Sequence, residues 1–211
     1  MHDLVIFDCD GVLVDSEVVS NQVLAGNLAG YGVSLTLSEC MAHFVGGTMR
    51  GVMQKAQSMG ADLPENWIDE IYAETYAGLR AGVPLVAGIS TLLGYLDEQG
   101  ISCCVASNGS EDKMLITLGQ NGLWDRFQGC MFSAHSFGVG KPEPDLFLAA
   151  AKQFGASNPV VIEDSPSGVT AAIRAEMRCL GYAEHSDGAN LRALGAEVFH
   201  DMADVPALLA Q

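Results

Sequence analysis

The sequence predicts an α/β protein whose parallel sheet is interrupted in the chain by a helical subdomain. Five short apolar runs that do not alternate with polar residues are typical of strands buried on both faces of a parallel sheet. Helical patterns separate these runs, so strands and helices alternate along the chain. The runs cover residues 4–7, 103–106, 131–133, 160–162 and 179–182.

The helices are predicted from their apolar spacing and from their first residues. Residues 89–96 and 146–154 each place apolar side chains three and four positions apart, which is the spacing of one helix face. Ser110 precedes two acidic residues, and Ser165 precedes Pro166, and both patterns are typical of a helix N-terminus. Two helices are therefore expected to start just beyond the second and fourth apolar runs.

The stretch from 16 to 82 differs from the rest because it holds several helical patterns and no convincing strand. It lies between the first and second predicted strands, so it reads as a helical subdomain inserted into a sheet domain. We expect a core domain of residues 1–15 and 83–211 and a helical domain of residues 16–82.

Length and composition limit the class of protein. The 211 residues are 49% apolar and 17% charged, which is typical of a globular protein. Ten Lys and Arg against 26 Asp and Glu give a formal net charge of −16, which disfavours nucleic acid and anionic membranes as partners. The N-terminus lacks a signal-peptide pattern, and no run of eighteen apolar residues occurs. With no disulfide or zinc spacing among six cysteines, we expect a cytoplasmic protein with reduced thiols.

Acidic residues follow two of the predicted strands at the point where each strand ends. Asp8 and Asp10 come after the first run and project to the same side, and Gly11 lets the backbone turn. Glu163 and Asp164 follow the fourth run. Ligands of open parallel sheets bind at the carboxyl ends of the strands, so the four carboxylates are expected at one edge. Such a concentration of negative charge predicts a bound hard cation, for which Mg²⁺ is the natural candidate.

A second set of residues at the same edge suits a phosphoryl group. Ser107, Asn108 and Gly109 follow the second run and supply a hydroxyl and backbone amides. Lys141 precedes a predicted helix and brings an ammonium group. Taken singly, each of these segments is equally typical of an ordinary turn or loop, so only their combination at strand ends favours a functional site.

Together these segments resemble the four ordered motifs of the haloacid dehalogenase superfamily, in its branch of small-molecule phosphatases and β-phosphoglucomutases. The resemblance covers the whole chain and implies a Rossmann-like parallel sheet core with an inserted α-helical cap. The segments are FDCDGVLVDSE, ASNGS, GKPEPD and VIEDSPSG.

The resemblance also implies a role for each matching residue. Asp8 would be the nucleophile that forms an aspartyl phosphate, and Asp10 would protonate the leaving alcohol and later deprotonate water. Ser107 and Lys141 would hold the phosphoryl oxygens, with Asn108 in the same substrate-binding segment.

The same motifs imply a Mg²⁺ site. The side chains of Asp8 and Asp164 and the backbone carbonyl of Asp10 would bind the ion, and Glu163 would be a ligand or the support of one. Arg50 lies in the segment 46–50, where related caps place a substrate-recognition loop, and is a candidate substrate contact.

The family offers two reactions, hydrolysis of a phosphomonoester and phosphoryl migration within a sugar. β-Phosphoglucomutases carry a histidine shortly after the first motif, whereas here no histidine occurs between His2 and His43. We therefore expect an enzyme, a Mg²⁺-dependent phosphatase of a small sugar or sugar-acid phosphate. A phosphosugar mutase is the alternative, and a non-catalytic phosphometabolite-binding protein is a further one. The expected partner is that small-molecule substrate, and the chain is expected to be a monomer or a weak dimer.

Overall fold

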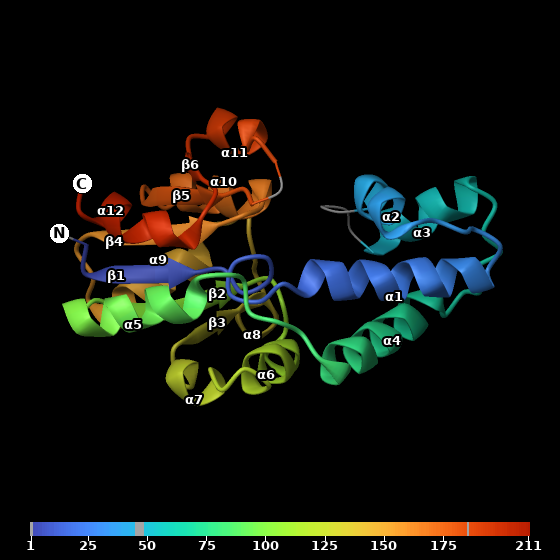
Figure 1. The fold of residues 1–211 in the computed structure, drawn as a ribbon, viewed down its shortest axis with the longest axis horizontal. Helices are drawn as coiled ribbons and strands as arrows, with labels where there is room; N and C mark the ends of the chain where they lie inside the picture. Colours follow the sequence, from blue (N-terminus) through green and yellow to red (C-terminus); the bar gives the residue numbers. More distant parts are fainter. Residues whose placement is uncertain (1, 45–48, 185) are drawn as a thin grey trace. The chain divides into compact units, whose positions relative to one another are not determined.

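The computed structural model describes residues 2–44, 49–184 and 186–211. The chain divides into two compact units, which we call the sheet unit and the helical unit (Figure 1). The sheet unit comprises Met1–Val14 and Pro84–Gln211, and the helical unit comprises Asp15–Val83. No helix in the described part of the chain is long and apolar enough to cross a membrane.

The sheet unit is built on six parallel strands in the order β3-β2-β1-β4-β5-β6 within the described residues. The predicted α/β class is confirmed, and a strand lies at each of the five apolar runs. The sixth strand was not expected, because it begins with the charged Glu197 and leaves only two apolar residues as a pattern. The strands are β1 (Leu4–Phe7), β2 (Ser102–Ser107), β3 (Met131–Ser133), β4 (Pro159–Glu163), β5 (Arg178–Tyr182) and β6 (Glu197–Phe199).

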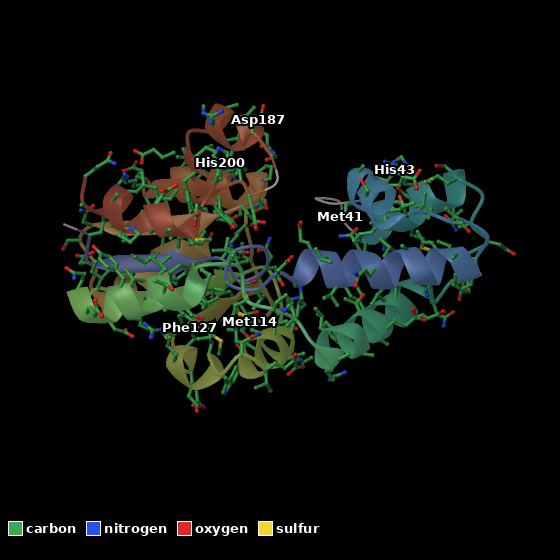
Figure 2. All side chains as sticks on the ribbon, viewed as in Figure 1. Met41, His43, Met114, Phe127, Asp187 and His200 are labelled. Atoms are coloured by element: carbon green, nitrogen blue, oxygen red, sulfur yellow. The ribbon has the colours of Figure 1, made fainter. Side chains whose placement is uncertain are left out.

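Helices follow the strands, as parallel connections require. On one face, α9 and α10 pack against Leu4 and Ile6 of β1 in a shared apolar core. Met114 on α6 and Phe127 on α7 are also buried; both are labelled in Figure 2. The helices of this unit are α5 (Ile89–Gln99), α6 (Glu111–Gly119), α7 (Trp124–Phe127), α8 (Ala134–Phe137), α9 (Asp145–Phe154), α10 (Pro166–Arg174), α11 (Ala189–Ala193), the 3₁₀ helix η1 (Met202–Asp204) and α12 (Val205–Leu209).

The predicted helix starts beyond β2 and β4 are present. The Ser110 hydroxyl accepts from the backbone N–H of Lys113 at the start of α6. The Ser165 hydroxyl accepts from Gly168 at the start of α10, with Pro166 as the first helical residue. These caps satisfy N–H groups that the helices leave unpaired, and they fix where each helix leaves the sheet edge.

The helical unit has its own apolar core. The largest fully buried side chain of its described residues, Trp67, packs in a cluster with Leu28 and Ile71, and its indole N–H donates to Asn27 Oδ1 at 2.7 Å. The helices of this unit are α1 (Ser16–Gly30), α2 (Leu37–Phe44), α3 (Met49–Ser58) and α4 (Trp67–Ala81).

The register of the central strands brings their carboxyl ends together. Phe7 at the end of β1 lies beside Val105 of β2 on one side and Ile162 of β4 on the other. The residues that follow these strands therefore meet at one edge of the sheet.

Candidate active site

The turn after β1 carries two acidic side chains at this edge. The Asp8 N–H donates to Ile162 O at 2.9 Å, which continues the β1–β4 ladder, and the residue is almost buried. Gly11 has a φ of +79°, a backbone conformation that favours glycine, and its N–H donates to Val14 O at 2.8 Å. The chain thus folds back immediately after Asp10, which holds both acids at the strand end.

Lys141 joins the acids of β1 and β4. Its Nζ lies 2.5 Å from Asp8 Oδ1 and 2.6 Å from Glu163 Oε1, and its side chain is 2% exposed. The ammonium also lies 5.2 Å from the centre of the Phe147 ring. The predicted convergence of the first, third and fourth motifs is therefore present as one buried ion triad.

The triad shifts the acidity of its members. Burial raises the pKa of Asp8 to about 7, while Lys141 opposes that rise and the carboxylates of Glu163 and Asp10 add to it. Burial alone would lower the pKa of Lys141, but the charges of Asp8 and Glu163 raise it above its usual range. Lys141 is therefore cationic, and its single charge does not offset the surrounding negative charge.

The Asn108 side chain holds the loop that carries Lys141. Its amide Oδ1 accepts from the Lys141 N–H at 2.8 Å, and its Nδ2 donates to the Lys141 carbonyl at 3.1 Å. A side chain on Gly140 would collide with Asn108 and with Ala134, so this approach requires glycine. Both polar ends of the side chain hold the backbone of the Lys141 loop, and the expected contact of this segment with a substrate stays a prediction.

Ser107 keeps a group that a phosphoryl oxygen could use. The residue is 2% exposed, and its Oγ accepts from the Gly109 N–H at 2.9 Å. Accepting that bond leaves the hydroxyl proton able to donate. Ser133 Oγ donates to Gly109 O at 2.7 Å and holds the same loop to the neighbouring strand.

Lys113 is a residue at this edge that the sequence reasoning missed. Its Nζ lies 2.8 Å from Asp10 Oδ1, and both side chains are partly exposed, at 21% and 26%. One signal was available: a lysine in the first turn of a predicted helix faces the positive end of the helix dipole, where acidic residues are favoured. The edge therefore holds a second ammonium group.

Glu163 is held by donors at both oxygens. Oε1 accepts from Lys141, and Oε2 accepts from the N–H and the hydroxyl of Ser165 at 2.8 and 2.9 Å. A Cβ on Gly168 would overlap this carboxylate. Glu163 thus holds Lys141 in place, and its expected role as a metal ligand or the support of one stays a prediction.

The remaining acidic groups fit a hard cation by charge and ligand type. Asp164 packs over Gly11, since a Cβ there would overlap its carboxylate, so it reaches the turn that carries Asp8 and Asp10. Among the described residues no three Asp, Glu, His or Cys side chains form a metal cluster, so four side-chain ligands are not assembled. Two carboxylates with a backbone carbonyl are a donor set that Mg²⁺ accepts. With every acid counted as ionised, the four acids and two lysines have a formal charge of −2, which one divalent cation would balance.

Arg50 belongs to the helical unit. Arg50 is exposed near the start of α3, and residues 45–48 of its loop lie outside the described residues. Its substrate contact stays a prediction. His43 is exposed on α2, and His200, just after β6, pairs through Nδ1 with Ala183 O at 2.7 Å; both are labelled in Figure 2.

Comparisons with known proteins agree with this arrangement. Residues 5–182 match the model of the family described as haloacid dehalogenase-like hydrolase. A haloacid dehalogenase family hydrolase from Deinococcus radiodurans, solved with bound phosphate and sodium, is 32% identical with a TM-score of 0.87, over 99% of this chain and 95% of that one. The 6-phosphogluconate phosphatase of Escherichia coli is 28% identical over 83% of this chain and 80% of its own length.

A longer relative is Protein SUPPRESSOR OF QUENCHING 1, chloroplastic, of Arabidopsis thaliana, which is 32% identical over 93% of this chain. The chain spans only 19% of that protein. The family match covers most of the chain, so the chain belongs to the haloacid dehalogenase-like hydrolases. The predicted family, fold and enzyme class, a hydrolase of phosphoric monoesters, are confirmed.

Proposed function

We propose that the chain is a Mg²⁺-dependent phosphatase that hydrolyses a small sugar phosphate or sugar-acid phosphate through a phosphorylated Asp8. The observation that carries this proposal is the contact of Lys141 with Asp8, which orients one nearly buried carboxylate beside a fixed cation. A carboxylate can act as a nucleophile toward phosphorus when nearby cations offset its repulsion from the phosphate. The similarity to a 6-phosphogluconate phosphatase supports the substrate class.

The first step forms a bond from an Asp8 oxygen to phosphorus and breaks the bond from phosphorus to the ester oxygen. Asp10 gives its proton to that leaving oxygen. Lys141 and the Ser107 hydroxyl hold the phosphoryl oxygens, on which charge is spread in the transition state. Glu163 keeps Lys141 in place from the opposite side.

The second step returns the enzyme to its first state. Water attacks phosphorus, the bond from Asp8 to phosphorus breaks, and Asp10 takes the proton that the water loses. A Mg²⁺ ion held by Asp8, Asp164 and the Asp10 carbonyl would neutralise negative charge on the phosphate during both steps. The cytoplasmic location and the monomer or weak dimer stay predictions.

The test is a screen of phosphorylated metabolites for released phosphate, with Mg²⁺ and again after its removal with EDTA. We expect turnover of sugar or sugar-acid phosphates that requires Mg²⁺ and falls by about 10⁴-fold or more in Asp8→Asn, because the nucleophile is lost. Asp8→Asn should remain folded, since it removes a charge that burial disfavours.

Two outcomes would contradict the proposal. Release of phosphate that is equal in Asp8→Asn would exclude Asp8 as nucleophile. Incubation with hexose 1-phosphates that yields mainly isomerised sugar phosphate, and little free phosphate, would favour the mutase.

A further inference from the structure

Lys113 occupies an unusual place for a lysine. It is the third residue of α6, so its positive charge lies in the first helical turn, where the helix dipole disfavours a cation. Its Nζ instead pairs with Asp10 Oδ1 at 2.8 Å. Helix stability therefore does not explain the residue, whereas its contact with the acid on the neighbouring turn does.

The backbone that carries Lys113 is held by several contacts. Its N–H donates to the Ser110 hydroxyl at 3.2 Å, and its carbonyl accepts from the Thr117 hydroxyl at 3.2 Å. Thr117 in turn lies 4.0 Å from the sulfur of Cys9, the residue between the two acids. α6 thus contacts the turn after β1 through Thr117, and the backbone of Lys113 is held within the helix by Ser110 and Thr117.

The two oxygens of Asp10 have different surroundings. Oδ1 faces Lys113, whereas Oδ2 lies 3.5 Å from the place that a Cβ on Gly109 would take. The stem of Lys113 lies 3.6 Å from the same place. The same Cβ would lie 3.2 Å from Ser107 Oγ, so Oδ2 lies toward the Ser107–Gly109 loop while Oδ1 is held by the ammonium.

We propose that Lys113 is a positioning residue, which holds the Asp10 carboxyl group in the orientation from which it serves the leaving oxygen of the substrate. The inference rests on the proposed phosphatase function. Proton transfer by a positioned side chain contributes about 10²–10⁴-fold to a rate, and a displacement of about 1 Å can remove about 10²-fold. Loss of Lys113 should therefore matter most when the leaving group needs a proton.

Two phosphate esters of nearly equal shape can distinguish the positioning of Asp10 from an effect of Lys113 on the phosphate or on the fold. Phenyl phosphate releases a basic phenolate and benefits from protonation, whereas 4-nitrophenyl phosphate releases a stable anion. The measured quantity is kcat/KM with Mg²⁺, because it reports the steps up to release of the alcohol and is unaffected by hydrolysis of the phosphorylated enzyme.

For Lys113→Met we expect kcat/KM to fall about 10- to 100-fold for phenyl phosphate and less than about threefold for 4-nitrophenyl phosphate. Lys113→Arg should recover most of the loss, because arginine keeps the charge near the same place. In Asp10→Asn, the added change Lys113→Met should cause no further loss on phenyl phosphate, because the group that Lys113 positions is already gone. Thermal unfolding of each variant checks that the fold is intact.

An equal loss on both esters would overturn the inference, since it would show that Lys113 acts on the phosphate or on the fold. Unchanged kcat/KM on both esters would overturn it as well, and so would a further loss in the double variant. Failure of the unmodified protein to hydrolyse either ester or any metabolite of the screen would instead overturn the proposed function, and this inference with it.

Discussion

The two units of the molecule differ in what they bury. Among the described residues, the sheet unit buries the charged side chains of Asp8, Lys141 and Glu163, whereas the buried polar residues of the helical unit are Ser16 and Asn21. The helical unit otherwise fills its interior with apolar side chains around Trp67. Both units are compact, so the buried charges are not a general requirement of this chain for folding.

This difference indicates that the sheet unit keeps buried charges at a cost to its stability. Removing charges from water is costly, and a buried ion pair seldom stabilises a fold more than apolar side chains of the same size would. The sheet unit nevertheless buries two carboxylates against one ammonium. Such an arrangement is typical of a site that must hold charge in place, which supports the proposed site in the sheet unit.

Lys141→Met tests this comparison with the largest expected effect. The change leaves the carboxylates of Asp8 and Glu163 buried without their partner, so we expect the free energy of unfolding to fall by about 3–5 kcal/mol. Turnover should fall by about 10²–10³-fold or more, because a cation that stabilises the transferring oxygens is lost. Urea unfolding and released phosphate measure the two effects.

Glu163→Gln is the matched control for this change. It keeps the hydrogen-bonding shape but leaves Lys141 with one carboxylate, so we expect smaller losses of both stability and turnover than in Lys141→Met. If Lys141→Met proved as stable as the unmodified protein, Lys141 would not be needed to balance the buried carboxylates. The contrast between the two units in what they bury would then not affect stability.

Trp67→Ala tests the helical unit. The indole is fully buried, so its loss should lower the stability of that unit by about 3–5 kcal/mol. Hydrogen exchange should speed up in peptides of α1 and α4 and stay unchanged in β1 and β4. Trp124→Ala, at a half-buried position on α7, is the control and should affect the sheet unit with a smaller loss. Equal acceleration in both units would show that they unfold together.

Much of the fold follows from patterns that the sequence states directly. A strand that is buried on both faces needs an unbroken apolar run, and five of the six strands meet that condition. The edge strand β6 was missed because Glu197 and its two neighbours give too little pattern. The predicted positions of Asp8 and Asp10 depend only on where β1 ends, so they needed no knowledge of side-chain packing.

The pairings within the site could not be predicted in the same way. No sequence pattern indicated that the Asn108 side chain pairs with the backbone of the Lys141 loop, and Lys113 was not singled out at all. Such contacts depend on how a loop and a helix turn pack together at the sheet edge. Local sequence patterns do not predict this packing. The positions of residues along the chain predict which residue types lie at the edge. Packing determines which of these side chains contact one another.

The smallest expected effect comes from Glu176, which follows α10 with a φ of +57°. That conformation strains any residue with a Cβ, and glycine is the usual choice just after a helix. Glu176→Gly should therefore stabilise the sheet unit by about 0.5–1 kcal/mol, whereas Glu176→Ala keeps the strain and should not. Calorimetry would detect a rise of about 2–4 °C per kcal/mol for a chain of this size.

This change tests whether the stability of the sheet unit can rise without a change in turnover. α10 begins next to Glu163 at the reactive edge and ends at Arg174, so Glu176 lies beyond the far end of the helix. Turnover should then stay constant while the unfolding temperature rises. A fall in turnover with Glu176→Gly would mean that the far end of α10 influences the edge, and that strain there contributes to the site.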